Sequence, residues 1–318
     1  MSKECQGEYP GLEHLAIHHG SLRCSKWNSR CGAQLESMMK PHVPAVVFIA
    51  FVGLGLTAHG AGGQKVTVPA NIVHEAYGAQ LAKYVDGRGL VRYADWKANA
   101  VDLKALDGYL AQFAAKPSLP AEGKEAAASL INLYNALTIR TILSNYPTKS
   151  IMALSNPFGA RRHLVGGTKV SLDDIEHGTL RPLIGERAHA VLVCAARSCP
   201  PLQRSVYRAE TLEAQIAMAF EVWLGREDLN RFQPELDRVE ISSIFKWFAE
   251  DFEKVGGVRK VLARRAPGKY RKFLSGDDYA IDYLTYNWGL NDQGTQGKNY
   301  GRGRLYFDRI LDTITFWK

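Results

Sequence analysis

The sequence predicts an α+β fold for residues 61–318. Apolar residues recur at helical spacing in the first part of this stretch, and short runs typical of strands follow later. This order favours an α+β domain over a regular alternation of strands and helices. We expect N-terminal helices packed on a small mixed or antiparallel sheet, with a papain-like or transglutaminase-like arrangement as one candidate. The stretch is long enough for a single domain with a well-buried core.

Helices are expected where apolar periodicity is bounded by breakers. Pro117 and Pro120 end one such pattern, and Pro147 ends the strongest. Ser171 with Asp174 three residues later is the signature of a capping box, which predicts a short helix over 171–180. The other expected helices cover residues 69–86, 93–113, 124–143, 211–224 and 243–254.

Strands are expected at four places after residue 160. Gly166-Gly167 supplies the positive φ that a two-residue hairpin turn requires, so 163–165 and 168–170 should pair. The apolar run 188–194 predicts a buried strand. Residues 238–241 and 281–286 are predicted as further strands.

Residues 43–56 (VPAVVFIAFVGLGL) are apolar throughout. This length is typical of the central part of a signal peptide and is below the roughly 18–20 residues that span a bilayer. Lys40 precedes the run, and small residues at positions 58 and 60 allow cleavage before Ala61.

These features predict a signal peptide over residues 38–60, which would begin at Met38 or Met39. Residues 1–37 are then a non-native upstream extension, and 61–318 form the exported domain. We expect a periplasmic or secreted protein. The alternative is an uncleaved N-terminal anchor, which would be its one contact with a membrane.

The chain carries 40 basic and 32 acidic residues, a formal net charge of +8. The charges are interspersed and no basic run alternates with aromatic residues, so we expect no nucleic-acid partner. The sequence has no glycine motif for nucleotides and no set of Cys and His residues with zinc-site spacing. We therefore expect neither a cofactor nor a metal.

The five cysteines divide into two groups. Cys5, Cys24 and Cys31 precede the predicted signal peptide, so the exported domain keeps only Cys194 and Cys199. In an oxidising compartment this pair can form a disulfide, or one member can act as a working thiol.

Asn132 and Asn135 lie three residues apart in the helix predicted over 124–143, and therefore on one face. An Asn side chain inside a helix competes for backbone hydrogen bonds, so two amides there indicate tertiary partners. Asn135 is accordingly a candidate orienting group in a site. The alternative is that both amides fasten a neighbouring loop.

Glu176, His177 and Arg181 follow the capping box. His177 and Arg181 are one helical turn apart and are expected to face the same cleft. His177 is a candidate general base and Glu176 a candidate orienting group. The alternative for His177 is a solvated histidine or one satisfied in the core.

His189 lies on the strand predicted over 188–194, and Cys199 follows it after a tight loop. The dipeptide Pro200-Pro201 suits the start of a helix, whose free amide groups would lower the pKa of Cys199 and favour its thiolate. Cys199 is therefore the candidate nucleophile and His189 a second candidate base. Cys194 is a buried strand cysteine or a resolving thiol, and the alternative for the pair is a structural disulfide.

Residues 286–291 (YNWGLN) combine aromatic and amide side chains near the C-terminal end of the predicted domain. Such a mixture is able to line a pocket. It is equally suited to wrapping an edge of the domain.

These clusters together resemble the domain-of-unknown-function family numbered 547, found in bacteria and plants. The matching stretches cover roughly residues 80–292 and are INLYNALTIRTIL, VGGTKVSLDDIEHGTLRP, HAVLVCAARSCPPL with VYRAETLEAQ, ISSIFKWFAEDF and YLTYNWGLN. The resemblance implies no activity, because the family has none assigned. Some plant members carry leucine-zipper, redox or signalling segments that this chain lacks, and the family tends to have Asp where this chain has Asn287.

Two classes of function remain. The first is a thiol-dependent hydrolase or acyl transferase that acts on peptides or proteins of the cell envelope. Its nucleophile would be Cys199, its base His177 or His189, and its orienting group Asn135 or Glu176. The second is a non-enzymatic envelope binding or scaffold module held by a Cys194–Cys199 disulfide. Thiol–disulfide exchange by the same two cysteines is a third hypothesis, although their spacing is not that of a CxxC motif.

Overall fold

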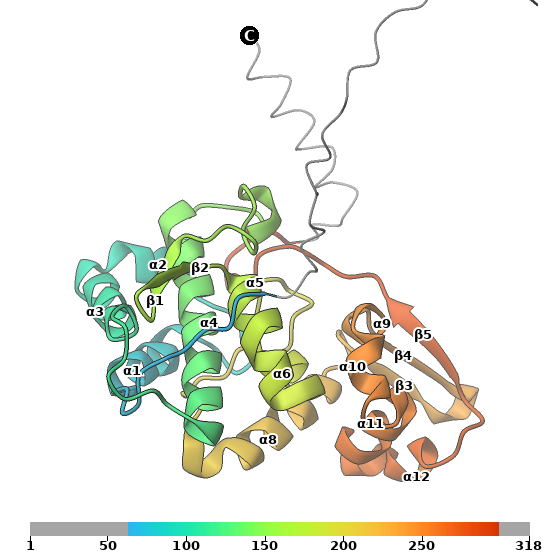
Figure 1. Cartoon of the computed structure of the whole chain (residues 1–318). Coiled ribbons are helices and arrows are strands. Elements are labelled where there is room, and N and C mark those ends of the chain that lie inside the picture. Colours follow the sequence, from blue (N-terminus) through green and yellow to red (C-terminus); the bar gives the residue numbers. More distant parts are fainter. Residues whose placement is uncertain (1–62, 299–318) are drawn as a thin grey trace, which may run out of the picture. The chain divides into compact units, whose positions relative to one another are not determined.

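The computed structural model describes residues 63–298 (Figure 1). The predicted extension 1–37, the signal peptide 38–60 with its cleavage site, and the first three cysteines lie outside the described residues. In the described part, no helix combines the length and the apolar character that crossing a membrane requires.

Helices make up most of the described secondary structure. The α-helices are α1 Glu75–Tyr84, α2 Tyr93–Ala98, α3 Ala100–Ala111, α4 Gly123–Asn145, α5 Leu172–Ile175, α6 Arg181–Ile184, α7 Ala188–Val191, α8 Leu212–Leu224, α9 Ile244–Trp247, α10 Ala249–Glu253, α11 Gly257–Arg265 and α12 Arg271–Leu274. A π-helical turn, Glu176–Leu180, continues α5 into α6. Single 3₁₀ turns cover Ile151–Ala153, Gly185–Arg187, Ala209–Thr211, Pro234–Leu236 and Gly268–Tyr270.

The strands form two small sheets. Strands β1 His163–Val165 and β2 Thr168–Val170 pair as the predicted hairpin, and both turn glycines, Gly166 and Gly167, have positive φ. The second sheet has the order β3 Arg231–Gln233, β4 Arg238–Ser242, β5 Ala280–Leu284. Strand β4 runs antiparallel to β3 and parallel to β5. The predicted α+β class is confirmed, and the second sheet is mixed.

Helix α4 lies at the centre of the helical part formed by α1–α6, and Figure 1 shows these helices arranged around it, with α9–α12 and the second sheet to one side. It contacts α2, α3, α5, α6 and the π-helical turn. Its residues from Ala127 to Ile139 are buried on every face. A helix that is apolar all round is stable only when other elements cover it completely. The predicted helix over 124–143 is thereby confirmed.

Two long predicted helices are broken in the structure. The pattern over 93–113 divides into α2 and α3 because Asn99 is extended and caps α3 by accepting a hydrogen bond from the amide of Asp102, 3.0 Å away. The pattern over 243–254 divides into α9 and α10 at Phe248. Helix α1 starts at Glu75, later than the predicted residue 69.

The strand predicted over 188–194 is wrong. Residues Ala188–Val191 form helix α7, and the chain becomes extended only from Leu192. Residues 188–193 are all buried, whichever side they face. A short apolar run buried on every side carries no alternation that separates a strand from a buried helical turn.

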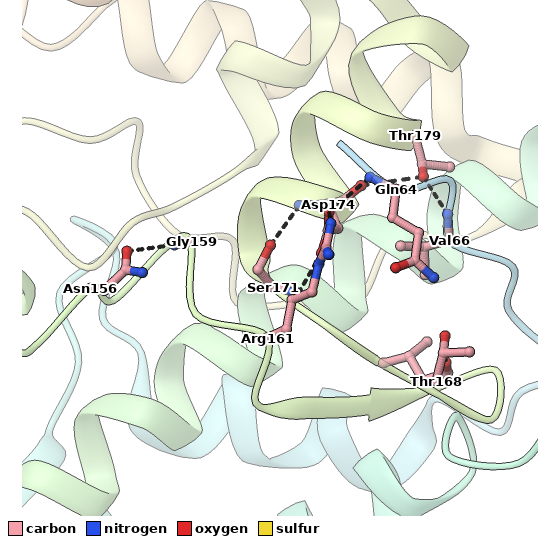
Figure 2. A network of polar contacts seen from close by, with 10 residues as sticks. Gln64, Val66, Asn156, Gly159, Arg161, Thr168, Ser171, Asp174 and Thr179 are labelled. Atoms are coloured by element: carbon pink, nitrogen blue, oxygen red, sulfur yellow. Dashed lines mark hydrogen bonds and ion pairs between the residues drawn. The ribbon is translucent and has the colours of Figure 1, made fainter. Parts of the chain in front are cut away.

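The predicted capping box is present and belongs to a larger network (Figure 2). Ser171 Oγ accepts from the amide of Asp174, and the carboxylate of Asp174 accepts from the amide of Ser171, both at 3.0 Å. The same carboxylate accepts from the amide of Gln64 at 2.8 Å and from Arg161 at 2.8 and 3.1 Å. The hydrogen bond from Arg161 is the main reason why the pKa of Asp174 lies well below its usual range, although burial opposes it. This network fixes the start of the helix that leads to Glu176.

Replacing Asp174 with Asn should lower the free energy of unfolding by about 2 kcal/mol, because charge-assisted hydrogen bonds to a buried carboxylate are lost. The loss should shrink on acidification. A carboxyl group with a depressed folded pKa stabilises the fold above its unfolded pKa of about 3.9 and loses this effect as the pH falls below that value. Chemical denaturation of the full chain at several pH values measures both effects.

The matched control is Asp173→Asn, one residue earlier, whose side chain is 44% exposed. This control should change the free energy of unfolding by less than about 0.5 kcal/mol. Equal losses in the two variants would contradict a special role for Asp174.

Candidate functional site

A pocket of about 180 Å³ lies where α4, the π-helical turn, α7 and α9 meet the segment after β5. This volume is below the roughly 300–1,000 Å³ of sites for drug-sized ligands, so it suits one end of a molecule. Six of its fourteen lining residues are aromatic, and thiols, carboxyl groups, imidazoles and two aliphatic side chains make up the rest. The lining residues are Tyr134, Phe158, Asp173, Glu176, His177, His189, Leu192, Cys194, Cys199, Ile244, Trp247, Phe248, Tyr286 and Trp288.

Four of the five residues that the sequence singled out for a catalytic role line this pocket: Glu176, His177, His189 and Cys199. They come from three separate segments of the chain. The fifth, Asn135, does not line the pocket. Its amide nitrogen donates to the carbonyl of Val191 at 3.0 Å, and its oxygen accepts from the amide of Val193 at 2.9 Å.

Asn135 therefore fastens the chain that leads into Cys194. Asn132, on the same face of α4, fastens Tyr207 in the same way through its carbonyl and its amide. Both side chains satisfy buried backbone groups that would otherwise have no partner. The two amides thus hold neighbouring segments of the chain, which was the alternative to a role of Asn135 in the site.

The loop that carries the cysteines is paired with residues 287–291. The amide of Arg197 donates to the carbonyl of Gly289 at 2.7 Å, and the amide of Asn291 donates to the carbonyl of Ala195 at 2.9 Å. Ala195 has a φ of 60°, a left-handed conformation that a non-glycine residue adopts only when its surroundings enforce it. This pairing brings Tyr286 and Trp288 beside the cysteines.

Cys194 and Cys199 are free thiols in this structure, and their Sγ atoms are 2.6 Å apart. No disulfide joins them in this structure, and the disulfide expected in an oxidising compartment stays a prediction. The hydroxyl of Tyr286 lies 3.2 Å from the sulfur of Cys199 and 3.5 Å from that of Cys194. The amide of Cys194 donates to the sulfur of Cys199 at 3.2 Å.

These contacts move the pKa values of the two thiols in opposite directions. Burial, the largest single effect, raises the pKa of Cys199, but hydrogen bonds from Cys194, Tyr286 and nearby backbone amides together lower it below its usual value. The hydrogen bond to Cys199, and then burial, raise the pKa of Cys194. Cys199 is thus the member of the pair better suited to ionise.

The cause that the sequence suggested for an activated Cys199 is wrong. No helix starts at Pro200-Pro201, and the next turn along the chain is the 3₁₀ turn Ala209–Thr211. The segment instead packs against Gly89, where a Cβ atom would collide with the backbone of Pro201 and Leu202. Side-chain and local backbone hydrogen bonds, not a helix N-terminus, support the thiolate.

His189 is paired with Asp251, a residue that sequence reasoning missed. Its Nε2 lies 2.9 Å from Oδ2 of Asp251, and its ring stacks on Phe248 with centroids 4.1 Å apart. Burial lowers the pKa of His189 to about 4, against the opposing effect of the Asp251 carboxylate. The imidazole is therefore neutral near pH 7, with its Nε2–H held by the carboxylate.

Arg181 connects the two histidines. Its Nη1 donates to Nδ1 of His177 at 2.7 Å, as expected for residues one turn apart, and its Nε donates to Asp251 at 2.6 Å. Although burial would raise the pKa of Asp251, hydrogen bonds from Arg181, His189 and Lys254 hold it well below its usual range. Asp251 is thus a fixed negative charge behind His189.

Neither cysteine sulfur makes a hydrogen bond with His177 or His189 within residues 63–298. The polar partner of the thiols is Tyr286. The imidazoles and the thiols share one pocket, and they are not in direct hydrogen-bond contact.

Residues 120–224 match the model of the family described as "Protein of unknown function, DUF547". The chain contains a DUF547 domain. No curated protein and no solved structure matches the chain.

The DUF547 match contains Tyr134, the π-helical turn, His189 and both cysteines. Asp251 and the aromatic residues of the segments 244–248 and 286–288 lie beyond it. The site therefore joins the DUF547 match to later parts of the chain. Within residues 63–298, no group of three or more His, Cys, Asp or Glu side chains is arranged to hold a metal ion.

His189 should titrate with a midpoint near pH 4 instead of its ordinary 6.5, because burial disfavours the imidazolium. The unfolded chain then binds its proton first, so this residue should make the fold less stable as the pH falls from 6.5 towards 4. NMR titration of the imidazole signals of the full chain, assigned with His189→Gln, measures the midpoint.

His163, whose pKa burial also lowers to about 4, must be assigned separately with His163→Gln. A His189 signal that titrates near its ordinary value would contradict the buried, neutral imidazole.

Proposed function

We propose that the pocket that contains Cys194 and Cys199 is the active site of a thiol-dependent hydrolase or acyl transferase. Cys199 is its nucleophile, and His189, oriented by Asp251, is its general base. One observation supports this proposal above all. Two thiols and a neutral imidazole with a carboxylate behind it, from segments far apart in sequence, line one small pocket. Nucleophile, base and orienting group are recognised by such geometry and not by their order in the chain.

The first step forms a thioester. The sulfur of Cys199 attacks a carbonyl carbon of the substrate, the bond from that carbon to the leaving group breaks, and the thiol proton passes to the leaving group. The lowered pKa of Cys199 assists this attack, and the Tyr286 hydroxyl, 3.2 Å away, donates to the developing thiolate.

The second step releases the product. Water or an amine attacks the thioester carbon, its proton goes to Nδ1 of His189, and the carbon–sulfur bond breaks. His189 then passes that proton to the sulfur of Cys199, which restores the thiol. Asp251 holds the Nε2–H of His189 throughout and stabilises the imidazolium as it forms. Because no hydrogen bond joins His189 to a thiol in residues 63–298, the proton passes from His189 to Cys199 through the bound substrate or a water.

The other predicted residues take supporting roles in this proposal. Arg181 fixes the orientation of His177 at the pocket wall. Glu176 lines the pocket with a pKa raised by burial. Asn135 positions the chain before Cys194 and contacts no reacting group. The apolar segment 43–56 supports export, so we propose peptides or proteins of the cell envelope as substrates.

The test uses an activated ester, p-nitrophenyl acetate, whose first turnover reports acylation of the nucleophile. Cys199→Ala should abolish the burst of p-nitrophenol. His189→Gln should slow the steady rate roughly 100-fold or more, because general-base assistance is lost. Mass spectrometry of the quenched full chain locates the acetyl group.

Cys194→Ala should keep an acetylated Cys199, although at a lower rate because one hydrogen bond to the thiolate is lost. A burst that survives Cys199→Ala, or an acetyl group on Cys194, would contradict the assignment. Unchanged kinetics in His189→Gln would exclude His189 as the base.

A second candidate, thiol–disulfide exchange, is favoured by the 2.6 Å separation of the two sulfurs. The Cys199 thiolate would attack a disulfide and release one thiolate, and Cys194 would then lose its proton and attack the mixed disulfide to release the second. The cysteine pair is oxidised by two electrons and the external disulfide is reduced. The opposed pKa shifts of the two thiols suit an attacking and a resolving cysteine.

Oxidised glutathione tests this second candidate. If exchange is the function, the wild type should lose two hydrogens and release two glutathione molecules, and Cys194→Ala should stop at a stable glutathione adduct on Cys199. Absence of any adduct, together with the acetylation result above, would exclude exchange and leave the acyl-transfer proposal.

A further inference from the structure

Three aromatic side chains form a continuous cluster at the wall of the pocket: Trp247, Tyr286 and Trp288. The ring centroids of Trp247 and Trp288 are 5.9 Å apart at an interplanar angle of 16°, and Tyr286 lies 4.8 and 4.7 Å from the two tryptophans. Trp247 is 41% exposed, which is unusual for a side chain of this size. The cluster therefore presents aromatic surface to whatever enters the pocket.

Six other aromatic rings of the described chain have cations beside them. Arg181 lies 5.0 Å from the centroid of Phe248, and lysine or arginine groups lie similarly over Tyr84, Phe220, Tyr270, Tyr279 and Tyr283. Within residues 63–298, no lysine or arginine lies over Trp247, Tyr286 or Trp288. Their negative ring faces are left without a cation.

Two carboxyl groups, those of Asp173 and Glu176, line the same pocket. Burial is the main cause that raises the pKa of each. Asp174 and Asp251 are paired with arginines, but among the described residues neither Asp173 nor Glu176 forms an ion pair with a lysine or arginine. Nε2 of His177 lies 3.6 Å from Oδ1 of Asp173.

Among the described residues, no lysine or arginine lines the pocket. Glu176 feels the charge of Arg181, which lowers its pKa against the effect of burial, but it forms no ion pair with this arginine. A partly buried carboxyl group without an ion-pair partner gains free energy when a positive group arrives, because the local dielectric constant is lower than that of water. The aromatic faces that line the same pocket act in the same direction. The carboxyl groups and the aromatic faces therefore favour the same class of ligand group, a positively charged one.

We propose that this pocket binds a positively charged ammonium group of the substrate, held between the Trp247–Tyr286–Trp288 cluster and the carboxylates of Glu176 and Asp173. The inference rests on the proposed function only in calling the bound molecule a substrate. The bound group would sit beside Cys199 and Cys194, which line the same pocket. The volume of about 180 Å³ suits a single ammonium-bearing end of a molecule.

The probes are choline and 3,3-dimethylbutan-1-ol, which have nearly the same shape and differ by the positive charge. Isothermal titration calorimetry of the full chain, at mildly alkaline pH so that the carboxyl groups ionise, measures both affinities. Choline should bind at least tenfold more tightly than its neutral counterpart. Equal affinities, or no choline binding at millimolar concentration, would overturn the proposal.

Glu176→Gln keeps the shape of the side chain and removes its charge, so it should weaken choline binding at least tenfold. The matched control is Glu221→Gln on the exposed face of α8, which should leave the affinity unchanged. Trp247→Leu should also weaken binding, and circular dichroism verifies its fold. Equal choline affinity in the wild type and Glu176→Gln would overturn the role of the carboxylate and with it the proposal.

The same titration with Cys199→Ala separates this inference from the proposed function. Choline binding should persist there, because the thiol is not part of the cation site. Choline binding without any acetylation of Cys199 in the wild type would retain the cation site and reject the thiol enzyme. Acetylation of Cys199 without selective choline binding would do the reverse.

Discussion

The site depends on the backbone pairing between the cysteine loop, residues 195–198, and residues 287–291. Hydrogen bonds between these two segments hold Ala195 in its left-handed conformation and place Tyr286 against both sulfurs. Figure 1 shows how the chain after β5 runs back from the second sheet to the helical part to make this contact. Without that return, the cysteine loop would lose the hydrogen bonds that hold Ala195, and the thiols would lose the hydroxyl and the aromatic wall beside them.

In the pocket and directly behind it, the surroundings give groups of one chemical type different pKa values. Cys199 receives hydrogen bonds that favour its thiolate, whereas Cys194 is held as a thiol. Hydrogen bonds from three donors lower the pKa of Asp251, whereas burial raises the pKa of Glu176. Titratable groups whose pKa values are pushed apart in one cavity are characteristic of sites that exchange protons.

Several parts of the fold could be predicted because they depend on local chemistry. The hairpin follows from two glycines that accept positive φ, the start of α5 from the capping box of Ser171 and Asp174, and α4 from its periodicity and the proline after it. Residues 188–194 could not be predicted in this way, because a run buried on every side has the same composition as a strand or as a helical turn. The prolines after Cys199 were equally ambiguous, since they suit a helix start and an irregular segment alike.

The sequence by itself determined which side chains were available for chemistry: Cys199, His177, His189 and Glu176 stand out by residue type, and all four line the pocket. Only the tertiary structure decided who their partners are. Asp251 lies 62 positions from His189 and Tyr286 lies 87 positions from Cys199, and at such separations no spacing rule applies. It also decided that Asn135 serves the backbone and not the site, because a buried amide pairs with whichever groups the packing leaves unsatisfied.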